Sequence, residues 1–381
     1  MNPVVEPIEK PLFSNTSNEA LHFRLSGVNV SLANSIRRTI LSDIPILVFK
    51  TTPYEKNKAN IIANTSRLNN EIIKQRLSCI PIHVKDITDF PLKNLQMEVK
   101  VENITDSIIF VTTEDFEIRD LVSGKLIPKD KTREIFPPDD FTGQFIDFVR
   151  LRPKISDELP GEKIHLTCEF SIGTAKEDGT FNVVSTCSYG FTPDEEKIDT
   201  EAVKLAQKYK DEGMKKEDVD FELKNWKLLD ALRIVKQDSF DFAVQTIGIY
   251  ENVELLQKAC EILIDKMNKI DGLIDTDELK ITDSLNTMEN SFDVILDNED
   301  YTIGKVIEYM LYKTYFEETK EMTFCGFKKM HPHDNYSIIR VAYTKSVSKS
   351  NVKQNLKACI SAIIQVYQRI HKSVVGLVKL K

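Results

Sequence analysis

The stretch LHFRLSGVNVSLANSIRRTIL, residues 21–41, carries the pattern that decides the fold. Apolar and polar residues alternate over its first five positions, which predicts a strand with one buried face. A short turn follows, and Ser31 stands where a helix N-cap is expected. Leu32, Ile36 and Ile40 then recur at intervals of four, which predicts an amphipathic helix. We therefore expect a strand, a tight turn and a helix.

The same pattern returns 271 positions later in FDVILDNEDYTIGKVIEYML, residues 292–311. Strand residues, cap and helix residues coincide at this offset: Phe23 with Val294, Leu25 with Leu296, Ser31 with Thr302, Ile36 with Ile307, and Ile40 with Leu311. Chance similarity between two common strand–helix units is the alternative. The joint agreement of strand parity, cap and helix phase favours an internal repeat.

Each copy is followed by a long helix with an apolar stripe, over residues 252–270 and from about Ser350. An apolar helix face needs a covering partner, and two related surfaces can meet like the faces of a dimer. Joining them in one chain raises their effective concentration. We therefore expect an intramolecular pseudo-two-fold pair. The residues expected at its interface are Ile36, Ile40, Ile307, Leu311, Leu356, Ile363 and Ile370.

The segment between the copies has a different pattern. From about residue 89, short alternating runs separated by Pro, Gly and Asp predict a β-rich region. Residues 198–236 are charged with both signs and predict a solvated helical excursion. The first ten residues read as a flexible lead-in, and the acidic stretch 271–290 as a linker. Together with the repeats, this predicts an α+β protein.

Composition narrows the function. The net charge is −8, from 51 basic and 59 acidic residues. This charge disfavours a protein whose main function is to bind nucleic-acid phosphates directly. No apolar stretch approaches the roughly 20 residues that span a bilayer, and the first residues lack a signal-peptide core. Six dispersed cysteines without a C-x-x-C motif predict reduced thiols in a cytosolic type of compartment.

Few residues suggest chemistry. His331 and His333, with Cys325 upstream, could bind a metal, but a plain loop is the favoured interpretation. Cys325 or Cys359 as a nucleophile lacks an identifiable base. No phosphate-binding glycine loop or cluster of aspartates is present, so we expect no catalytic residue, no metal, no cofactor and no small-molecule substrate.

Several motifs resemble the α-subunit-like assembly subunits of multisubunit RNA polymerases. Those of the first part resemble bacterial α and the larger subunit 3, and those of the last part the smaller partner, subunit 11. For the first they are Phe23-Arg24-Leu25, SLANSIRRTIL (31–41), Asp43-Ile44-Pro45, Asn64-Thr65-Ser66-Arg67-Leu68, Leu151-Arg152-Pro153, Gly161-Glu162 and residues 172–177. For the second they are residues 299–304, Phe324-Cys325-Gly326-Phe327 and His331-Pro332.

The resemblance implies a fused subunit 3/11 that serves as a non-catalytic assembly platform of a DNA-directed RNA polymerase. Its implied partners are two large catalytic subunits and small assembly subunits, with DNA reached only through the complex. The implied domains are a discontinuous dimerisation domain (12–88 and 237–282), an inserted β-rich domain (89–236) and a second dimerisation domain (283–381). A free-standing nucleic-acid-binding or regulatory protein with the same fold is the alternative.

Two further expectations follow from the resemblance. Some relatives carry a Cys-rich metal site in the second domain, whereas this chain has only Cys168 and Cys187 there, which again predicts no metal. The fused arrangement is similar to that in some large cytoplasmic DNA viruses. It therefore implies a cytoplasmic viral factory and possible packaging in the virion, or the nucleus for a cellular protein.

Asn34, Arg37 and Arg38 lie in the first repeat helix, beside the apolar face. The resemblance implies that this region faces the large subunits, and arginine forms bidentate contacts with carboxylates. A solvated or intramolecular ion pair is the alternative. In the second copy the position of Arg37 is Glu308, so the pair is electrostatically asymmetric, which lets one copy bind a partner that the other rejects.

Overall fold

A computed structural model describes residues 1–9, 20–156, 160–285 and 288–378 of the chain. It mixes helices with open sheets, which confirms the predicted α+β class. The chain divides into two compact units. We call Met1–Ile40, Thr186–Gln245 and Asn252–Lys381 the repeat unit, and Leu41–Ser185 with Thr246–Glu251 the inserted unit.

This division differs from the boundaries predicted at residues 88/89 and 236/237. Residues 46–64 group with the inserted unit because two of their strands pair there, β3 (Ile46–Val48) with β10 (Ser171–Gly173) and β4 (Ala59–Asn64) with β9 (Lys163–Glu169). The predicted domain boundaries stay a prediction, and the predicted start at residue 12 lies outside the described residues.

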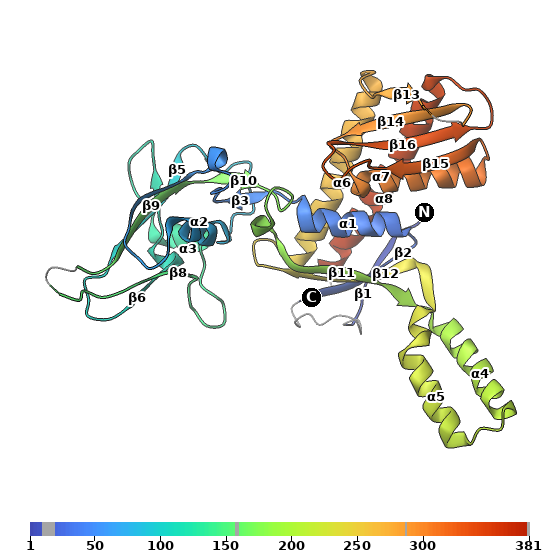
Figure 1. Ribbon diagram of the computed structural model, residues 1–381, viewed down its shortest axis with the longest axis horizontal. Coiled ribbons are helices and arrows are strands. Elements are labelled where there is room, and N and C mark those ends of the chain that lie inside the picture. The colour runs from blue at the N-terminus through green and yellow to red at the C-terminus, as the bar shows by residue number, and fades with distance from the viewer. Residues whose placement is uncertain (10–19, 157–159, 286–287, 379–381) are drawn as a thin grey trace. The chain divides into compact units, whose positions relative to one another are not determined.

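The repeat unit contains two four-stranded sheets built in the same order (Figure 1). The first runs β1-β2-β12-β11 and the second β13-β14-β16-β15. In the first sheet the bounds are Val4–Pro7 for β1, Leu21–Ser26 for β2, Val235–Thr246 for β12 and Val184–Pro193 for β11. In the second they are Ile281–Asp283 for β13, Ser291–Asp297 for β14, Tyr336–Tyr343 for β16 and Met322–Lys328 for β15.

The two edge strands β1 and β13 correct two sequence predictions. The supposed lead-in contains β1, which pairs antiparallel with β2. The supposed linker contains the end of a helix and then β13, which pairs antiparallel with β14. Both strands are short and mostly exposed, so their residues lack the alternation that marks a longer half-buried strand.

Four helices accompany these sheets. Their bounds are Val30–Ser42 for α1, Asn252–Asp275 for α6, Tyr301–Leu311 for α7 and Lys349–Val378 for α8. Helix α8 packs against α6 and α7, and a π-helical turn, Tyr312–Glu318, continues α7. Gly304 of α7 lies against the ring of Phe327. A Cβ atom at this position would stand only 1.9 Å from Phe327 Cε2. The close approach of α7 to β15 therefore requires glycine.

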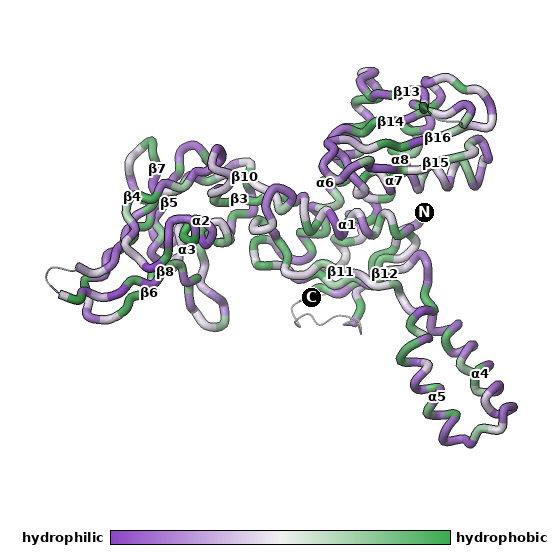
Figure 2. The backbone as a smooth tube through the Cα atoms, in the orientation of Figure 1, coloured by the Kyte–Doolittle hydropathy of each residue, from purple (hydrophilic) through white to green (hydrophobic). Residues whose placement is uncertain are grey.

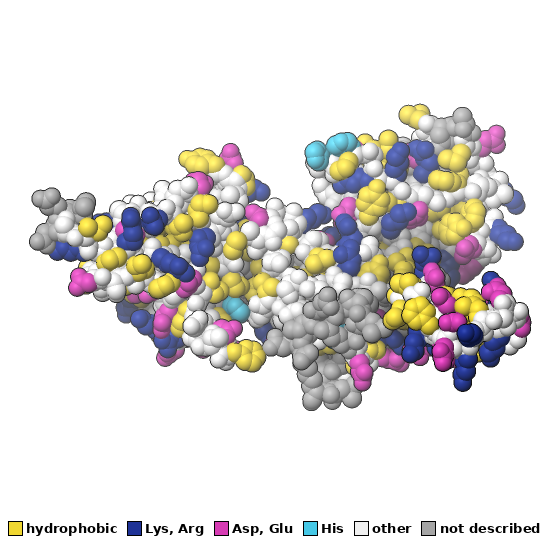
Figure 3. All heavy atoms as spheres, turned by 60° about the horizontal axis from the view of Figure 1, so that its bottom comes forward, with side chains coloured by type: hydrophobic (Ala, Val, Ile, Leu, Met, Phe, Trp, Pro, Cys, Tyr) yellow, Lys and Arg dark blue, Asp and Glu magenta, His cyan; other side chains and the backbone are white. Residues whose placement is uncertain are grey.

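The charged segment is helical and forms a hairpin, which groups with the repeat unit. Helix α4 (Glu195–Asp211) and α5 (Lys216–Leu228) pack together between β11 and β12, and a 3-10 turn, Asp230–Arg233, leads back to β12 (Figure 1). Polar and apolar segments alternate along both helices (Figure 2). Hydrophobic side chains lie among charged ones on its surface (Figure 3). The exposed apolar residues are Val203, Phe221, Leu228, Leu229 and Leu232.

The inserted unit is mostly β. Its largest sheet runs β4-β9-β5-β7, and two-stranded pairs are formed by β6 with β8 and by β3 with β10. The remaining bounds are Leu95–Glu102 for β5, Ile109–Thr112 for β6, Glu117–Asp120 for β7 and Asp147–Leu151 for β8. Its helices are α2 (Asn70–Ser78) and α3 (Lys129–Ile135), with 3-10 turns at Tyr54–Lys56, Thr113–Asp115 and Gly179–Phe181.

Aromatic side chains fill the core of the inserted unit. The ring of Phe116 contacts those of Phe136 and Phe148, and Phe49 contacts Phe136 and Phe170. All five side chains are buried. In no described part of the chain is a helix both long enough and apolar enough to cross a membrane.

Candidate interface between the two halves

Both repeat helices begin earlier than predicted, at matching positions. Asn29 Oδ1 accepts a hydrogen bond from the Ser31 backbone N–H at 2.9 Å, and Asp300 Oδ1 accepts one from the Thr302 N–H at 2.8 Å. Their carbonyls also receive backbone bonds from the first turn. Ser31 and Thr302 were therefore wrong as caps, because each is the second helical residue. Asn29 and Asp300 are themselves 271 positions apart, so the repeat holds.

Each sheet has one arginine–aspartate pair across its two central strands. In the first, Arg24 of β2 stands opposite Asp241 of β12, with Nε to Oδ1 at 2.7 Å and Nη2 to Oδ2 at 3.0 Å. In the second, Arg340 of β16 stands opposite Asp293 of β14, at 2.7 Å in both bonds. A bidentate pair thus recurs in both sheets with the two residue types exchanged. The arginine lies on β2, the earlier strand, in the first sheet, and on β16, the later strand, in the second.

The second pair predicts a pH dependence. Hydrogen bonds from Arg340 outweigh burial and lower the pKa of Asp293 below its usual value. Stability from a depressed carboxylate pKa is present above the unfolded-state pKa and is lost as pH falls through the folded-state value. We expect the urea midpoint to fall between about pH 5 and about pH 2, and to fall less in the Asp293→Asn variant. An equal slope in both proteins would contradict this assignment.

Helices α6 and α8 pack along each other, and their charged edges match. Lysines at intervals of four on α8 meet aspartates from the end of α6 and from the segment through β13. The ion pairs are Lys349–Asp283 at 3.4 Å, Lys353–Asp277, and Lys357 with Asp275 at 2.5 Å and with Asp271 at 3.9 Å. At the other end, His371 Nε2 lies 3.2 Å from Glu261 Oε1. The helices therefore run antiparallel.

The apolar residues predicted for the interface are all buried. Each has an exposed fraction of 2% or less: Ile36, Ile40, Ile307, Leu311, Leu356, Ile363 and Ile370. Burial is what an interface or a core requires, so their assignment to the surface between the two copies stays a proposal.

Hydrogen bonds of two residues, Arg38 and Ser35, join α1 of the first copy to elements of the second. Arg38 donates from Nε to Thr302 Oγ1 at 2.9 Å and from Nη2 to Asp300 Oδ2 at 3.1 Å, at the start of α7. The Ser35 and Tyr367 hydroxyls lie 2.6 Å apart between α1 and α8, and both side chains are buried. The two halves are therefore linked by specific polar contacts.

The three residues predicted to contact large subunits divide into two groups. Arg37 Nε donates to Asn34 Oδ1 at 3.0 Å, and both side chains are half-buried. Arg38 instead forms the intramolecular pair with Asp300 that was weighed as the alternative. Their contact with another subunit stays a prediction.

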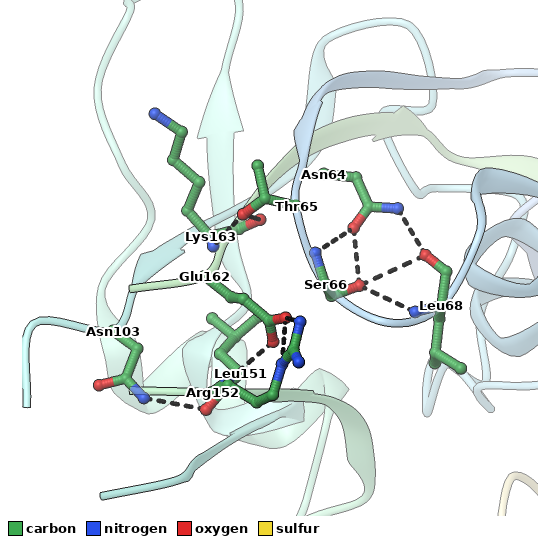
Figure 4. Close-up of polar contacts among 9 residues, drawn as sticks. All are labelled: Asn64, Thr65, Ser66, Leu68, Asn103, Leu151, Arg152, Glu162 and Lys163. Atoms are coloured by element: carbon green, nitrogen blue, oxygen red, sulfur yellow. Dashed lines mark hydrogen bonds and ion pairs between the residues drawn. The ribbon is translucent and has the colours of Figure 1, made fainter. Parts of the chain in front are cut away.

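The sequence interpretation missed a polar cluster in the inserted unit (Figure 4). In the turn after β4, Asn64 Oδ1 accepts from the Ser66 N–H at 3.0 Å and from Ser66 Oγ at 2.7 Å. Thr65 and Lys163 are joined twice, by a backbone bond from Thr65 N at 3.0 Å and by one from Lys163 N to Thr65 Oγ1 at 2.8 Å. The turn is thereby fixed to the start of β9.

Arg152 and Glu162 form the other half of this cluster (Figure 4). Glu162 accepts from the Arg152 backbone N–H at 2.8 Å and from its Nε at 2.6 Å. Burial works to raise the pKa of Glu162, but the bonds from Arg152 outweigh it and hold the pKa below its usual value. A Cβ at Gly161 would stand 1.7 Å from the Asn103 carbonyl oxygen, so only glycine fits there. Segments far apart in sequence that carried the resemblance therefore meet in one place.

The residues weighed for metal binding or nucleophilic chemistry have structural contacts. His331 Nδ1 accepts from the His333 backbone N–H at 3.2 Å within one loop. Among the described residues, no group of three or more potential ligands could hold a metal ion. Burial raises the pKa of the Cys325 and Cys359 thiols to about 12 each, which disfavours the thiolate needed for nucleophilic attack.

Comparison with known proteins agrees with this geometry. A family model described as the RNA polymerase Rpb3/Rpb11 dimerisation domain matches residues 22–267, and a second model with that description matches residues 291–373. The first match spans more than half of the chain and runs from β2 through most of α6. The second covers β14 to most of α8, so each match contains one structural copy, and the first also spans the inserted unit.

Similar proteins carry matching names. The chain is 27% identical to DNA-directed RNA polymerases I and III subunit rpac1 of Dictyostelium discoideum, across 72% of this chain and 84% of that protein. It is 24% identical to RNA polymerase subunit Rpo3 of Methanosphaera stadtmanae, across 68% and 97%. Human RPAC1 is 23% identical, across 66% and 80%. The chain belongs to the RNA polymerase Rpb3/Rpb11 dimerisation-domain family, and with both domains fused in one polypeptide it is an assembly subunit of a multisubunit DNA-directed RNA polymerase.

Proposed function

We propose that this chain is the non-catalytic platform on which two large catalytic subunits and small assembly subunits of the polymerase come together, and that it reaches DNA only through them. One observation carries the proposal: both copies, with equal strand order and matching helix caps, lie in one compact unit. A pair that is otherwise formed by two chains is here available within one, so no separate dimerisation step is needed before the large subunits bind.

The surface proposed for a large subunit is centred on Asn34 and Arg37. The Asn34 amide oxygen holds the Arg37 guanidinium, which lowers the conformational entropy lost when the arginine binds a carboxylate. In the second copy the position of Arg37 is taken by Glu308, whose Oε2 lies 2.6 Å from Lys305 Nζ. The two copies therefore present different charges at this position. This difference supports selective binding of one large subunit to the first copy, rather than equal binding to both copies.

The experiment is an affinity purification of tagged full-length chain from its native cells, with mass spectrometry of the captured proteins. We expect two very large subunits in near-equal amounts from the unmodified chain. The Arg37→Glu variant should keep its far-ultraviolet circular dichroism spectrum and capture roughly tenfold less of at least one large subunit, because reversing a charge at an interface leaves its partner charge unpaired.

Arg233→Glu is the matched control, because this arginine is exposed on the turn after α5 and should leave capture unchanged. Undiminished capture of both large subunits by Arg37→Glu would remove the proposed contact. Capture of the chain alone, from every cell fraction, would remove the platform function. We further propose that the fused arrangement acts in a cytoplasmic viral factory and is packaged in the virion. Purification from separate cytoplasmic and nuclear extracts shows in which compartment the complex is present.

A further inference from the structure

We propose that Arg38, Asp300 and Thr302 form an asymmetric clasp that makes the first half of the chain pair with the second half in preference to a copy of itself. This goes beyond the assembly function, which requires that the halves pair but does not say what prevents like halves from pairing. The problem is real for this chain, because the two halves share strand order, cap position and helix phase.

The clasp is a charge-assisted contact at the start of α7. The Arg38 guanidinium donates to both the Thr302 hydroxyl and the Asp300 carboxylate, and the other Asp300 oxygen caps α7. Both charged side chains are partly shielded, with exposed fractions of 37% for Arg38 and 23% for Asp300. Such a position screens the charges less than open solvent does, and the two bonds fix the orientation of the guanidinium.

The repeat shows what each element would meet in the wrong pairing. At the offset of 271, Asp300 corresponds to Asn29 and Thr302 to Ser31. Two first halves would therefore place Arg38 against a neutral amide and a hydroxyl, without a carboxylate. Arg38 in turn corresponds to Tyr309. Two second halves would place a phenol against Asp300, without a cation. Only the pairing of unlike halves brings opposite charges together.

A second contact, in the buried part of the same surface, has the same asymmetry. Ser35 and Tyr367 exchange a hydrogen bond between α1 and α8. The position corresponding to Ser35 in the second copy is Val306, so two second halves would leave the buried Tyr367 hydroxyl facing a methyl group. A buried hydroxyl without a partner is costly, whereas the loss of one hydrogen bond with both groups solvated is not. The pairing of two second halves is thus disfavoured in addition to lacking the clasp.

The first test measures whether the clasp contributes to folding. Full-length Arg38→Gln, Asp300→Asn and the double variant form a cycle, and Asp300→Asn keeps an oxygen that can cap α7. We expect the product of the two single effects on the unfolding equilibrium constant to exceed the effect of the double variant by about fivefold or more. Additive effects would overturn the clasp.

The second test measures whether the charges of the clasp decide which first half pairs with which second half. It compares pairing within one chain with an exchanged dimer, in which each chain's first half pairs with the second half of the other chain. Full-length Arg38→Glu and full-length Asp300→Arg each place like charges together when the two halves of one chain pair with each other. In an exchanged dimer of the two variants, the introduced glutamate meets the introduced arginine at one surface, and the native Arg38 meets the native Asp300 at the other. The loss of the α7 cap in Asp300→Arg affects both arrangements equally, so it does not bias the comparison.

Differently tagged variants are unfolded together in urea, refolded and separated by size with light scattering. We expect about tenfold more mixed dimer than from two wild-type chains treated in the same way. A mixture that yields no more mixed dimer than wild type would overturn the inference, even where the cycle shows coupling, because the clasp would then stabilise without selecting. Arg37→Glu, which tests the proposed function, should leave both results unchanged, so the two proposals can fail separately.

Discussion

Replacing Ile363 by alanine is expected to lower the free energy of unfolding by about 2–5 kcal/mol, the range for isoleucine-to-alanine changes at buried positions. Ile363 lies in the middle of α8 with an exposed fraction of 0%. Its side chain is proposed to fill the surface between the two halves, where close packing leaves little room for neighbours to close the cavity. The loss should therefore combine the transfer of the missing methyl groups with the cost of the remaining space.

The measurement is urea unfolding followed by circular dichroism. The tryptophan signal is unsuitable because the chain has one tryptophan, Trp226, and it lies in the α4–α5 hairpin. Ser361→Ala is the control, since Ser361 is exposed on the same helix and its replacement should change stability by less than about 0.5 kcal/mol. A loss for Ile363→Ala within that same margin would show that the surface is not tightly packed at this residue.

Gly304→Ala is expected to destabilise the second copy by about 1–3 kcal/mol. The added methyl group would overlap the ring of Phe327, which is packed in turn against Tyr301 at a centroid distance of 5.1 Å. Relief requires the Phe327 ring to leave a largely buried position. This loss should exceed the gain that alanine gives over glycine in a helix.

Gly272→Ala supplies a control of the opposite sign. Gly272 is in α6, is exposed, and has no neighbouring atom within 4 Å of the position that an added methyl group would take. Here only the higher helix propensity of alanine over glycine acts, so the variant should be more stable to unfolding by about 0.4–1 kcal/mol. Thermal unfolding of the two variants side by side measures both changes. Equal shifts in the same direction would contradict the assignment of the Gly304 effect to Phe327.

The central elements of the fold could be predicted because their burial leaves a periodic record. The alternation in β2 and the intervals of α1 and α7 reflect one buried face each. The edge strands β1 and β13 leave no such record, because they are short and exposed. The caps were misplaced by two residues because serine and threonine are also good caps, and the competing Asn29 and Asp300 are equally suitable.

The candidate interface was harder to predict than the elements that form it. The apolar stripe of α8 indicated which residues are buried, but periodicity cannot say which surface buries them. The destination of Arg38 depends on a long side chain that reaches a different copy, and neighbouring residues give no signal for that. One signal was available: Asp300 and Asn29 occupy equivalent positions with different charge, and so do Tyr309 and Arg38.

The spacing of the central strands bears on the order in which the chain folds. Arg24 and its partner Asp241 are 217 residues apart, whereas Asp293 and Arg340 are 47 apart. In an otherwise unfolded chain, closing the longer loop costs about 1.4 kcal/mol more entropy, and non-local pairing of this kind slows folding. The β3–β10 pair ties the two ends of the inserted unit together, so its prior folding shortens that loop. When the complete chain refolds, we therefore expect the second sheet to form early on its own, and the first to close last, after the insertion.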